Sequence, residues 1–188
     1  MIIAPAPETF AARYDGGVPQ VVWTTLVADL ETPVSAFLKV ADRRPMSFLF
    51  ESVEGGAVRG RYSIIGMNPD LIFKVEGNNA SVNRRAATKP DGAFEPLPLP
   101  PLAALRGLLA ESRIRLPEDA PPMAAGVFGY MGYDMVRLME DLPAPNPDTL
   151  GLPDSMLIRP TVMAIFDSVR DEVTVTSPVY PEKNMTAR

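Results

Sequence analysis

The sequence predicts a mixed α+β fold, in which antiparallel β-sheets of meander or sandwich type are flanked by helices. Runs rich in β-branched and aromatic residues follow one another with short glycine- and asparagine-marked turns between them. Segments with apolar residues at helical spacing come in separate blocks and do not alternate regularly with the strands. The composition, 46% hydrophobic and 22% charged, is that of a chain with a packed core.

The residue types that are missing restrict the chemistry available to the chain. Its 188 residues include 0 His and 0 Cys. Serine–histidine triads, cysteine nucleophiles, histidine bases and ordinary zinc sites therefore cannot be built from these residues alone. The net charge of -5 argues against nucleic acids and anionic membrane surfaces as partners. No apolar stretch approaches the ~18 residues of a membrane-spanning helix, so we expect a cytoplasmic location.

The first half of the chain is expected to be rich in strands. Residues 1–17 are expected to be a loose N-terminal segment, and residues 20–27 a strand. Thr32 followed by Pro33 is typical of the start of a helix, which is expected to continue for about ten residues. Four further strands are predicted as an antiparallel meander with short turns, at residues 46–53, 61–66, 71–76 and 80–84.

The second half alternates between proline-rich loops and regular elements. The loops are predicted at residues 86–100 and 143–153. A helix is expected to begin at Pro101, with Leu102, Leu105, Leu108 and Leu109 on one side. The remaining expected elements are a buried strand at 124–130, a helix capped by Asp134, and a hairpin formed by residues 159–166 and 172–176.

The glycines between residues 126 and 134 occur at a spacing of three. This spacing matches neither of the glycine-rich phosphate-binding patterns, and no Lys-Ser/Thr pair follows. We expect these glycines to let a strand pack closely against another backbone.

A pocket is suggested by the strand that contains Ser52. Because side chains alternate between the two faces of a strand, Phe48, Phe50 and Ser52 share one face. A small hydroxyl in place of a third large apolar group leaves space and one polar contact, which suits a ligand with a polar end and an apolar body. The alternative is that Ser52 lies at the end of the strand and contacts only water.

Arg61, in the strand expected to pair with this one, is the candidate partner for a ligand carboxylate. The alternative for this side chain is an ion pair with Glu51 or Glu54. The acidic pairs Glu140/Asp141 and Asp167/Asp171 are isolated, and no cluster has the oxygen-ligand density of a magnesium site.

Several stretches, taken in order, resemble the N-terminal region of anthranilate synthase component I. They are residues 32–39 (Thr-Pro-Val-Ser-Ala-Phe-Leu-Lys), 48–56 (Phe-Leu-Phe-Glu-Ser-Val-Glu-Gly-Gly), 60–66 (Gly-Arg-Tyr-Ser-Ile-Ile-Gly), 126–140 and 146–157. The resemblance spans about residues 18–180. It implies that residues 1–188 are a single effector-binding domain that continues into a longer enzyme.

The resemblance also implies an activity, partners and site residues. The complete enzyme of that family is a lyase of tryptophan biosynthesis, which makes anthranilate and pyruvate from chorismate with ammonia from a glutamine amidotransferase component II. It uses Mg²⁺ and is feedback-inhibited by tryptophan at an allosteric site. By resemblance, Ser52, Glu51, Arg61 and Pro33 belong to that tryptophan site, whereas no catalytic, chorismate-binding or metal-binding residue of the family lies in this span. Phe50 stands where the family commonly has leucine, which leaves the affinity for the inhibitor open.

Other functions remain as alternatives at this stage. Component I of para-aminobenzoate synthase is similar in fold and substrate. A stand-alone amino-acid-binding module and an interaction domain that docks the amidotransferase are the alternatives from other classes.

Overall fold

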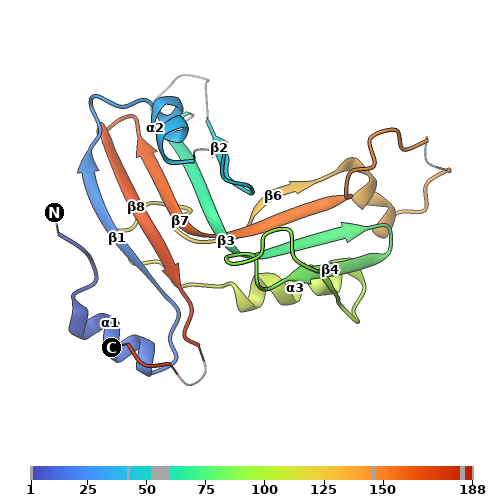
Figure 1. Cartoon of the computed structure of the whole chain (residues 1–188), viewed down its shortest axis with the longest axis horizontal. Helices are drawn as coiled ribbons and strands as arrows, with labels where there is room; N and C mark the ends of the chain where they lie inside the picture. The colour runs from blue at the N-terminus through green and yellow to red at the C-terminus, as the bar shows by residue number, and fades with distance from the viewer. Residues whose placement is uncertain (1, 42, 52–59, 145–146, 183–184, 188) are drawn as a thin grey trace. The chain divides into compact units, whose positions relative to one another are not determined.

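A computed structural model describes residues 2–41, 43–51, 60–144, 147–182 and 185–187 (Figure 1). Its helices are α1 (Pro7–Asp15), α2 (Pro33–Val40), α3 (Pro101–Glu111) and the 3-10 helix η1 (Tyr133–Leu138). Its strands are β1 (Gln20–Val27), β2 (Phe48–Phe50), β3 (Tyr62–Glu76), β4 (Asn79–Asn83), β5 (Glu95–Pro96), β6 (Phe128–Met131), β7 (Ser155–Asp167) and β8 (Glu172–Val179). The α+β class with antiparallel strands is confirmed.

The strands are hydrogen-bonded in the order β1-β8-β7-β3-β4-β5, with β2 paired to β3 and β6 paired to β7. The chain divides into two compact units. Unit 1 comprises Met1–Asn68, Arg113–Gly126 and Pro160–Arg188, and unit 2 comprises Pro69–Ser112 and Val127–Arg159. The long strands β3 and β7 each contribute one half to unit 1 and the other half to unit 2.

Unit 1 is built on the strands β1, β8, the second half of β7 and the first half of β3. The predicted strand at 20–27 is confirmed, and it pairs with β8 along its whole length. The predicted final hairpin is also confirmed, as β7 and β8. One face of these strands carries an apolar cluster of Ile65, Met67 and Phe166, against which α2 packs through Ala36 and Phe37.

Helix α2 begins as the sequence predicts. The Thr32 side chain accepts a hydrogen bond of 3.0 Å from the Ser35 amide, and the Ser35 hydroxyl accepts one of 3.0 Å from the Thr32 amide. Pro33 occupies the first helical position, where its missing amide hydrogen costs nothing. These reciprocal bonds satisfy two amides that a helix start leaves unpaired.

Removing this cap is expected to destabilise the chain measurably. Thr32→Ala leaves the Ser35 amide without its partner, and we expect a loss of about 1 kcal/mol in the free energy of unfolding. Thr32→Ser keeps the accepting oxygen and is the matched control, with an expected change of only a few tenths of a kcal/mol. Denaturant titration of both variants measures the difference. Equal effects of serine and alanine would show that the cap bond contributes nothing.

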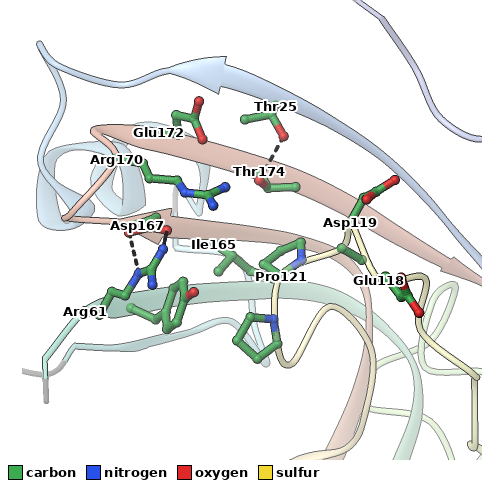
Figure 2. A pocket seen from close by; sticks show the side chains of 13 residues that line it. Thr25, Arg61, Glu118, Asp119, Pro121, Ile165, Asp167, Arg170, Glu172 and Thr174 are labelled. Carbon is green, nitrogen blue, oxygen red and sulfur yellow. Dashed lines mark hydrogen bonds and ion pairs between the residues drawn. The ribbon is translucent and has the colours of Figure 1, made fainter. Parts of the chain in front are cut away.

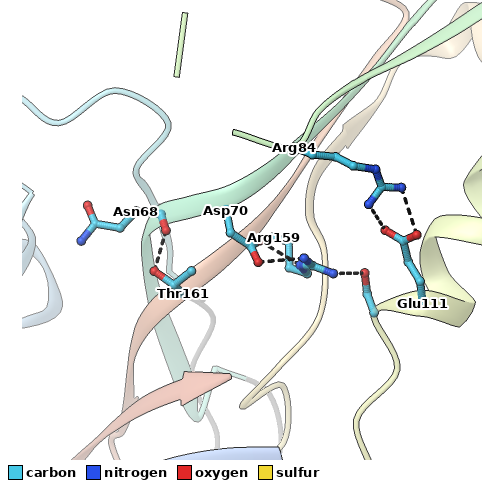
Figure 3. A network of polar contacts seen from close by, with 7 residues as sticks. Asn68, Asp70, Arg84, Glu111, Arg159 and Thr161 are labelled. Atoms are coloured by element: carbon cyan, nitrogen blue, oxygen red, sulfur yellow. Dashed lines mark hydrogen bonds and ion pairs between the residues drawn. The ribbon is translucent and has the colours of Figure 1, made fainter. Parts of the chain in front are cut away.

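Two expectations for unit 1 are wrong. Residues 7–15, within the segment expected to be loose, form helix α1. The turn expected at residues 67–70 does not interrupt the chain, because β3 is one continuous strand. Asn68 adopts a left-handed backbone conformation within that strand, and its carbonyl accepts a 2.6 Å hydrogen bond from the Thr161 hydroxyl of β7 (Figure 3). Asparagine tolerates this conformation better than most residues, so β3 can continue through residues whose sequence is typical of a turn.

Unit 2 has its own core between α3 and the strands β3 and β4. Leu71, Phe73 and Val75 of β3 pack there with residues of the other elements, and Phe73 is fully buried. The cluster is completed by Ala80, Val82, Ala104, Leu105, Leu108, Met135 and Leu157. The helix predicted from Pro101 is confirmed, although Leu109 lies 49% exposed outside its buried side.

The proline-rich loops are only partly free of regular structure. Glu95–Pro96 forms the short strand β5 inside the loop predicted at 86–100, and it pairs with β4. The described residues of 143–153 contain no helix or strand.

The glycine-rich segment differs from its expected form. Only residues 128–131 form a strand, β6, and its Tyr130 and Met131 are exposed rather than buried. Asp134 does not cap a helix; it lies in the first turn of η1, whose N-cap is Gly132, and pairs with Arg137 at 2.7 Å. No described helix has both the length and the apolar character needed to cross a membrane.

The expected close packing of the glycines is confirmed at Gly129. A Cβ atom there would lie 2.0 Å from the carbonyl oxygen of Met156, and the backbone φ is +150°. Gly132 is similar, since its Cβ would lie 2.9 Å from the carbonyl oxygen of Asp154. These residues therefore serve the pairing of β6 with β7 rather than an exposed anion-binding loop.

Candidate functional site

A polar pocket of about 460 Å³ lies in unit 1, between the β7–β8 hairpin and residues 118–122 (Figure 2). Its lining residues are Thr25, Arg61, Tyr62, Glu118, Asp119, Ala120, Pro121, Pro122, Ile165, Asp167, Arg170, Glu172 and Thr174. A volume of this order accommodates a small molecule of amino-acid size.

Strand alternation explains why these side chains meet. Ile165 lies opposite Thr174, and Asp167 lies opposite Glu172, across the β7–β8 ladder. The intervening pair, Phe166 and Val173, points to the other face and joins the apolar cluster under α2. Unit 1 thus has one sheet face covered by α2 and an opposite face that carries the pocket.

The floor of the pocket combines hydroxyl groups with an apolar contact. Thr25 of β1 and Thr174 of β8 are paired across the strands, and their hydroxyl oxygens lie 3.0 Å apart. Ile165 and Pro121 both line the pocket, and Pro121 belongs to the segment 118–122. That segment is fixed farther along, where the buried Thr176 hydroxyl donates a 3.1 Å hydrogen bond to the carbonyl of Ala124.

Arg61 is held against the β7–β8 turn by a bidentate ion pair. Its Nε and Nη2 atoms donate hydrogen bonds of 2.8 and 2.5 Å to the two carboxylate oxygens of Asp167. The Arg61 carbonyl also accepts 3.0 Å bonds from the amide and the hydroxyl of Ser168. The guanidinium lies 5.0 Å from the centroid of the Tyr62 ring. An ion pair was therefore the right kind of contact to expect for Arg61, but its described partner is Asp167 and not Glu51. Glu54 lies outside the described residues.

The ion pair shifts the pKa values of both partners. The hydrogen bonds from Arg61, reinforced by the Val169 amide, lower the pKa of Asp167 below its ordinary value of 3.8, although burial opposes this shift. The hydrogen bonds to Asp167 raise the pKa of Arg61. Because the folded-state pKa of Asp167 is depressed, its contribution to stability is fully present above pH 3.8 and is lost as the pH falls through the folded-state value.

The direction of this pKa shift can be tested by substitution. We expect Asp167→Asn to lower the free energy of unfolding at about pH 6, and this difference from the wild type to shrink as the pH falls below about 4. Asp171→Asn is the matched control: it removes a carboxylate of the same turn that lies outside the ion pair, and asparagine tolerates the left-handed backbone found there. Urea titrations at several pH values measure the difference. A deficit independent of pH would contradict the assignment.

Arg170 is the other cation of the pocket. It is exposed, and among the residues that the structure describes it takes part in no ion pair. In Figure 2 its guanidinium lies between Glu172 and Asp167. The charge of Arg61 is therefore neutralised by Asp167, whereas the charge of Arg170 is available to a ligand.

The residues predicted for an effector site are not all brought together. Arg61 lines the pocket, whereas Pro33 begins α2, which packs against the opposite face of the same sheet. Glu51 directly follows β2 and is exposed. Ser52 lies outside the described residues, so its place in a site stays a prediction.

The strand that leads to Ser52 has the expected arrangement. The antiparallel pairing is confirmed, with Phe48 opposite Gly66 and Phe50 opposite Ile64. Phe48 and Phe50 share one face, and their ring centroids lie 4.5 Å apart. Leu49 points to the other face and packs on the apolar cluster under α2.

Sequence reasoning missed the acidic and hydroxyl side of the pocket. The sequence indicates Asp167 only as a member of an isolated acidic pair, and it does not single out Arg170, Glu172 and Thr174. The signal that could have found them is the alternation along the predicted hairpin, which places polar residues on the face opposite Phe166 and Val173. No comparable pattern predicts that residues 118–122 line the pocket, because side chains in an irregular segment do not alternate between faces.

Unit 2 also contains a cavity, of about 580 Å³, lined by residues 78–79, 97–102 and 137–138. Its cation is already engaged, since Arg137 binds Asp134 and donates a 2.6 Å hydrogen bond to the carbonyl of Pro143. The two arginines labelled in Figure 3 are likewise paired within unit 2. Arg159 binds Asp70 at 2.8 and 2.7 Å, and Arg84 binds Glu111 at 2.8 and 3.0 Å.

Within the described ranges, no group of three or more acidic side chains is arranged to hold a metal ion. The site that this structure does present is a pocket for a small polar molecule, on an α+β scaffold of antiparallel strands.

Comparison with known proteins identifies relatives of this chain. No protein-family model matches the chain. Anthranilate synthase component 1 of Cereibacter sphaeroides is 51% identical over 181 residues, covering 96% of this chain and 36% of the relative. The protein of the same name from Thermus thermophilus is 39% identical over 164 residues, covering 87% of this chain and 33% of the relative.

A solved structure agrees in fold. The crystal structure of anthranilate synthase component I from Streptococcus pneumoniae TIGR4 matches with a TM-score of 0.50 at 21% identity, over 87% of this chain and 32% of that one. The chain thus spans about a third of the length of the proteins it matches. It is homologous to the N-terminal part, about 35%, of anthranilate synthase component I.

Proposed function

We propose that the chain is the N-terminal regulatory part of an anthranilate synthase component I. The observation that carries this proposal is the 51% identity to such a protein over 96% of the chain. The complete enzyme would be a cytoplasmic lyase of tryptophan biosynthesis, which makes anthranilate and pyruvate from chorismate. Ammonia would come from glutamine through an amidotransferase component II.

We propose further that the chorismate site, and the Mg²⁺ that the reaction uses, lie in the two thirds of the enzyme that this chain does not span. The residues described here would then bind no substrate and would be inactive alone. The chain contains no histidine or cysteine that could act as a base or nucleophile, which supports this division of labour.

The regulatory role that we propose is feedback inhibition by tryptophan. Two features support it: a pocket of amino-acid size lies in unit 1, and Arg61, one of the four residues proposed from resemblance, lines that pocket. Tryptophan would inhibit by binding more tightly to a state of the enzyme in which the distant chorismate site is poor. Ser52 and Glu51 follow β2, whose Phe50 pairs with Ile64 of β3.

Product analysis of the complete enzyme tests this proposal. Purified with its amidotransferase, or supplied with ammonia, it is expected to convert chorismate to anthranilate in the presence of Mg²⁺, and tryptophan is expected to suppress the reaction. Formation of an aminodeoxychorismate instead would identify a para-aminobenzoate synthase component I. No turnover combined with tight tryptophan binding would favour a stand-alone amino-acid-binding module.

A further inference from the structure

The pocket of unit 1 contains two arginines in different situations. Arg61 is bound at both ends: its guanidinium holds Asp167 in a bidentate pair, and its carbonyl accepts two bonds from Ser168. A ligand carboxylate at the same guanidinium edge would have to displace Asp167. Since the Asp167 side chain is only 13% exposed, losing its cation would leave a largely buried charge without compensation. Arg61 is therefore poorly placed to receive a ligand's carboxylate at this edge.

Arg170 has the opposite properties. Its guanidinium lines the pocket and is exposed, and it forms no ion pair with any residue in the described ranges. Its backbone is fixed by a 3.2 Å hydrogen bond from its amide to the Asp167 carbonyl. The Asp167 carboxylate in turn accepts a 3.0 Å bond from the Val169 amide. The contacts thus run from Arg61 through Asp167 to the turn that carries Arg170.

The rest of the lining suits a zwitterion with an apolar body. Glu172, two residues after Arg170, also lines the pocket, so the lining offers an opposite charge to the carboxylate and to the ammonium group of an amino acid. Ile165, Pro121 and the ring of Tyr62 supply apolar surface. Glu118 and Asp119 add negative charge to the opposite wall, which disfavours a ligand that carries a carboxylate without an ammonium group.

We propose that Arg170 binds the carboxylate of an aromatic α-amino acid in this pocket, and that Arg61 is a positioning residue that holds the turn carrying Arg170. This proposal rests on the proposed function, because it names the residue that recognises the effector. It reverses the role that resemblance suggested for Arg61.

Calorimetric titration of the complete enzyme with tryptophan, together with thermal unfolding, separates the two roles. Arg170→Gln is expected to raise the dissociation constant of tryptophan about tenfold to a hundredfold, the effect of losing a hydrogen-bonded charge, with a midpoint of unfolding within about 1 °C of the wild type. Arg61→Gln is expected to weaken binding and also to lower the midpoint by several degrees, because it releases Asp167. Arg13→Gln, at an exposed position of α1, is the matched control and should change neither quantity.

A second ligand tests the role of the tryptophan carboxylate separately. Tryptophan amide carries a neutral group in its place, so Arg170→Gln is expected to change its dissociation constant less than about threefold. Wild-type affinity for tryptophan in Arg170→Gln would overturn the inference while leaving the proposed function in place. An Arg61→Gln variant that loses binding at unchanged stability would assign the carboxylate to Arg61 instead. A wild-type enzyme that binds no tryptophan would overturn the proposed function, and this inference with it.

Discussion

Replacing Ser52 by phenylalanine in the complete enzyme is expected to raise the tryptophan concentration for half-inhibition by about tenfold or more. The physical reason is volume: if Ser52 provides the space at the pocket that its position after Phe48 and Phe50 predicts, a large ring there must displace either the ligand or its neighbours. Overpacking of this kind costs about 1–3 kcal/mol, which corresponds to roughly fivefold to 150-fold in affinity. Anthranilate formation at a series of tryptophan concentrations measures the shift.

Ser52→Ala provides the comparison. It keeps the space and removes only the hydroxyl, so we expect a smaller loss of sensitivity, about fivefold, from one hydrogen bond. Each variant is referred to its own rate without tryptophan, so that catalysis and inhibition are separated. Normal sensitivity of Ser52→Phe would exclude Ser52 from the tryptophan site.

Gly129→Ala is expected to be among the most destabilising single substitutions of the chain. The added Cβ would lie 2.0 Å from the carbonyl oxygen of Met156, far inside van der Waals contact, and the backbone has φ +150°. Relief requires β6 to move away from β7, with loss of ladder hydrogen bonds. We expect the free energy of unfolding to fall by about 3 kcal/mol or more, measured by denaturant titration.

Gly151→Ala separates the contact from the backbone conformation. Gly151 also has a positive φ, of +61°, but a Cβ there would meet no atom within 4 Å. Its expected cost is therefore only the conformational one, about 1–2 kcal/mol. If the two substitutions had equal effects, the close approach of β6 to the Met156 carbonyl would carry no energy and the explanation of Gly129 would fail.

The regular elements could be predicted where local signals agree with the tertiary structure. Residues 20–27 are rich in β-branched residues and form β1, and the capping residues Thr32 and Pro33 begin α2. The antiparallel pairing of β2 with β3 could be predicted from two strands joined by a glycine-marked segment. In each case, a single periodicity or cap motif pointed to the structure that packing also favours.

Local signals failed where packing overrides them. Asn68 and Pro69 indicate a turn, yet they lie within β3, where the Asn68 carbonyl is bonded by Thr161, which is 93 residues away. The partner of Arg61 is Asp167, which is 106 residues away in the sequence. No sequence pattern predicts a pair at such a separation. The pocket is for the same reason only partly predictable: Arg61 was a candidate from its strand, whereas residues 118–122 reach it through an irregular segment.

Hydrogen exchange of the complete enzyme, with and without tryptophan, tests the central claim most directly. If unit 1 of this chain binds the effector, tryptophan is expected to slow exchange in peptides that contain Tyr62 and in those that contain Arg170 to Thr174. Peptides from β4 and β5 of unit 2 serve as the internal control. Protection confined to the two thirds of the enzyme outside this chain, with no change around the pocket, would contradict a tryptophan site here.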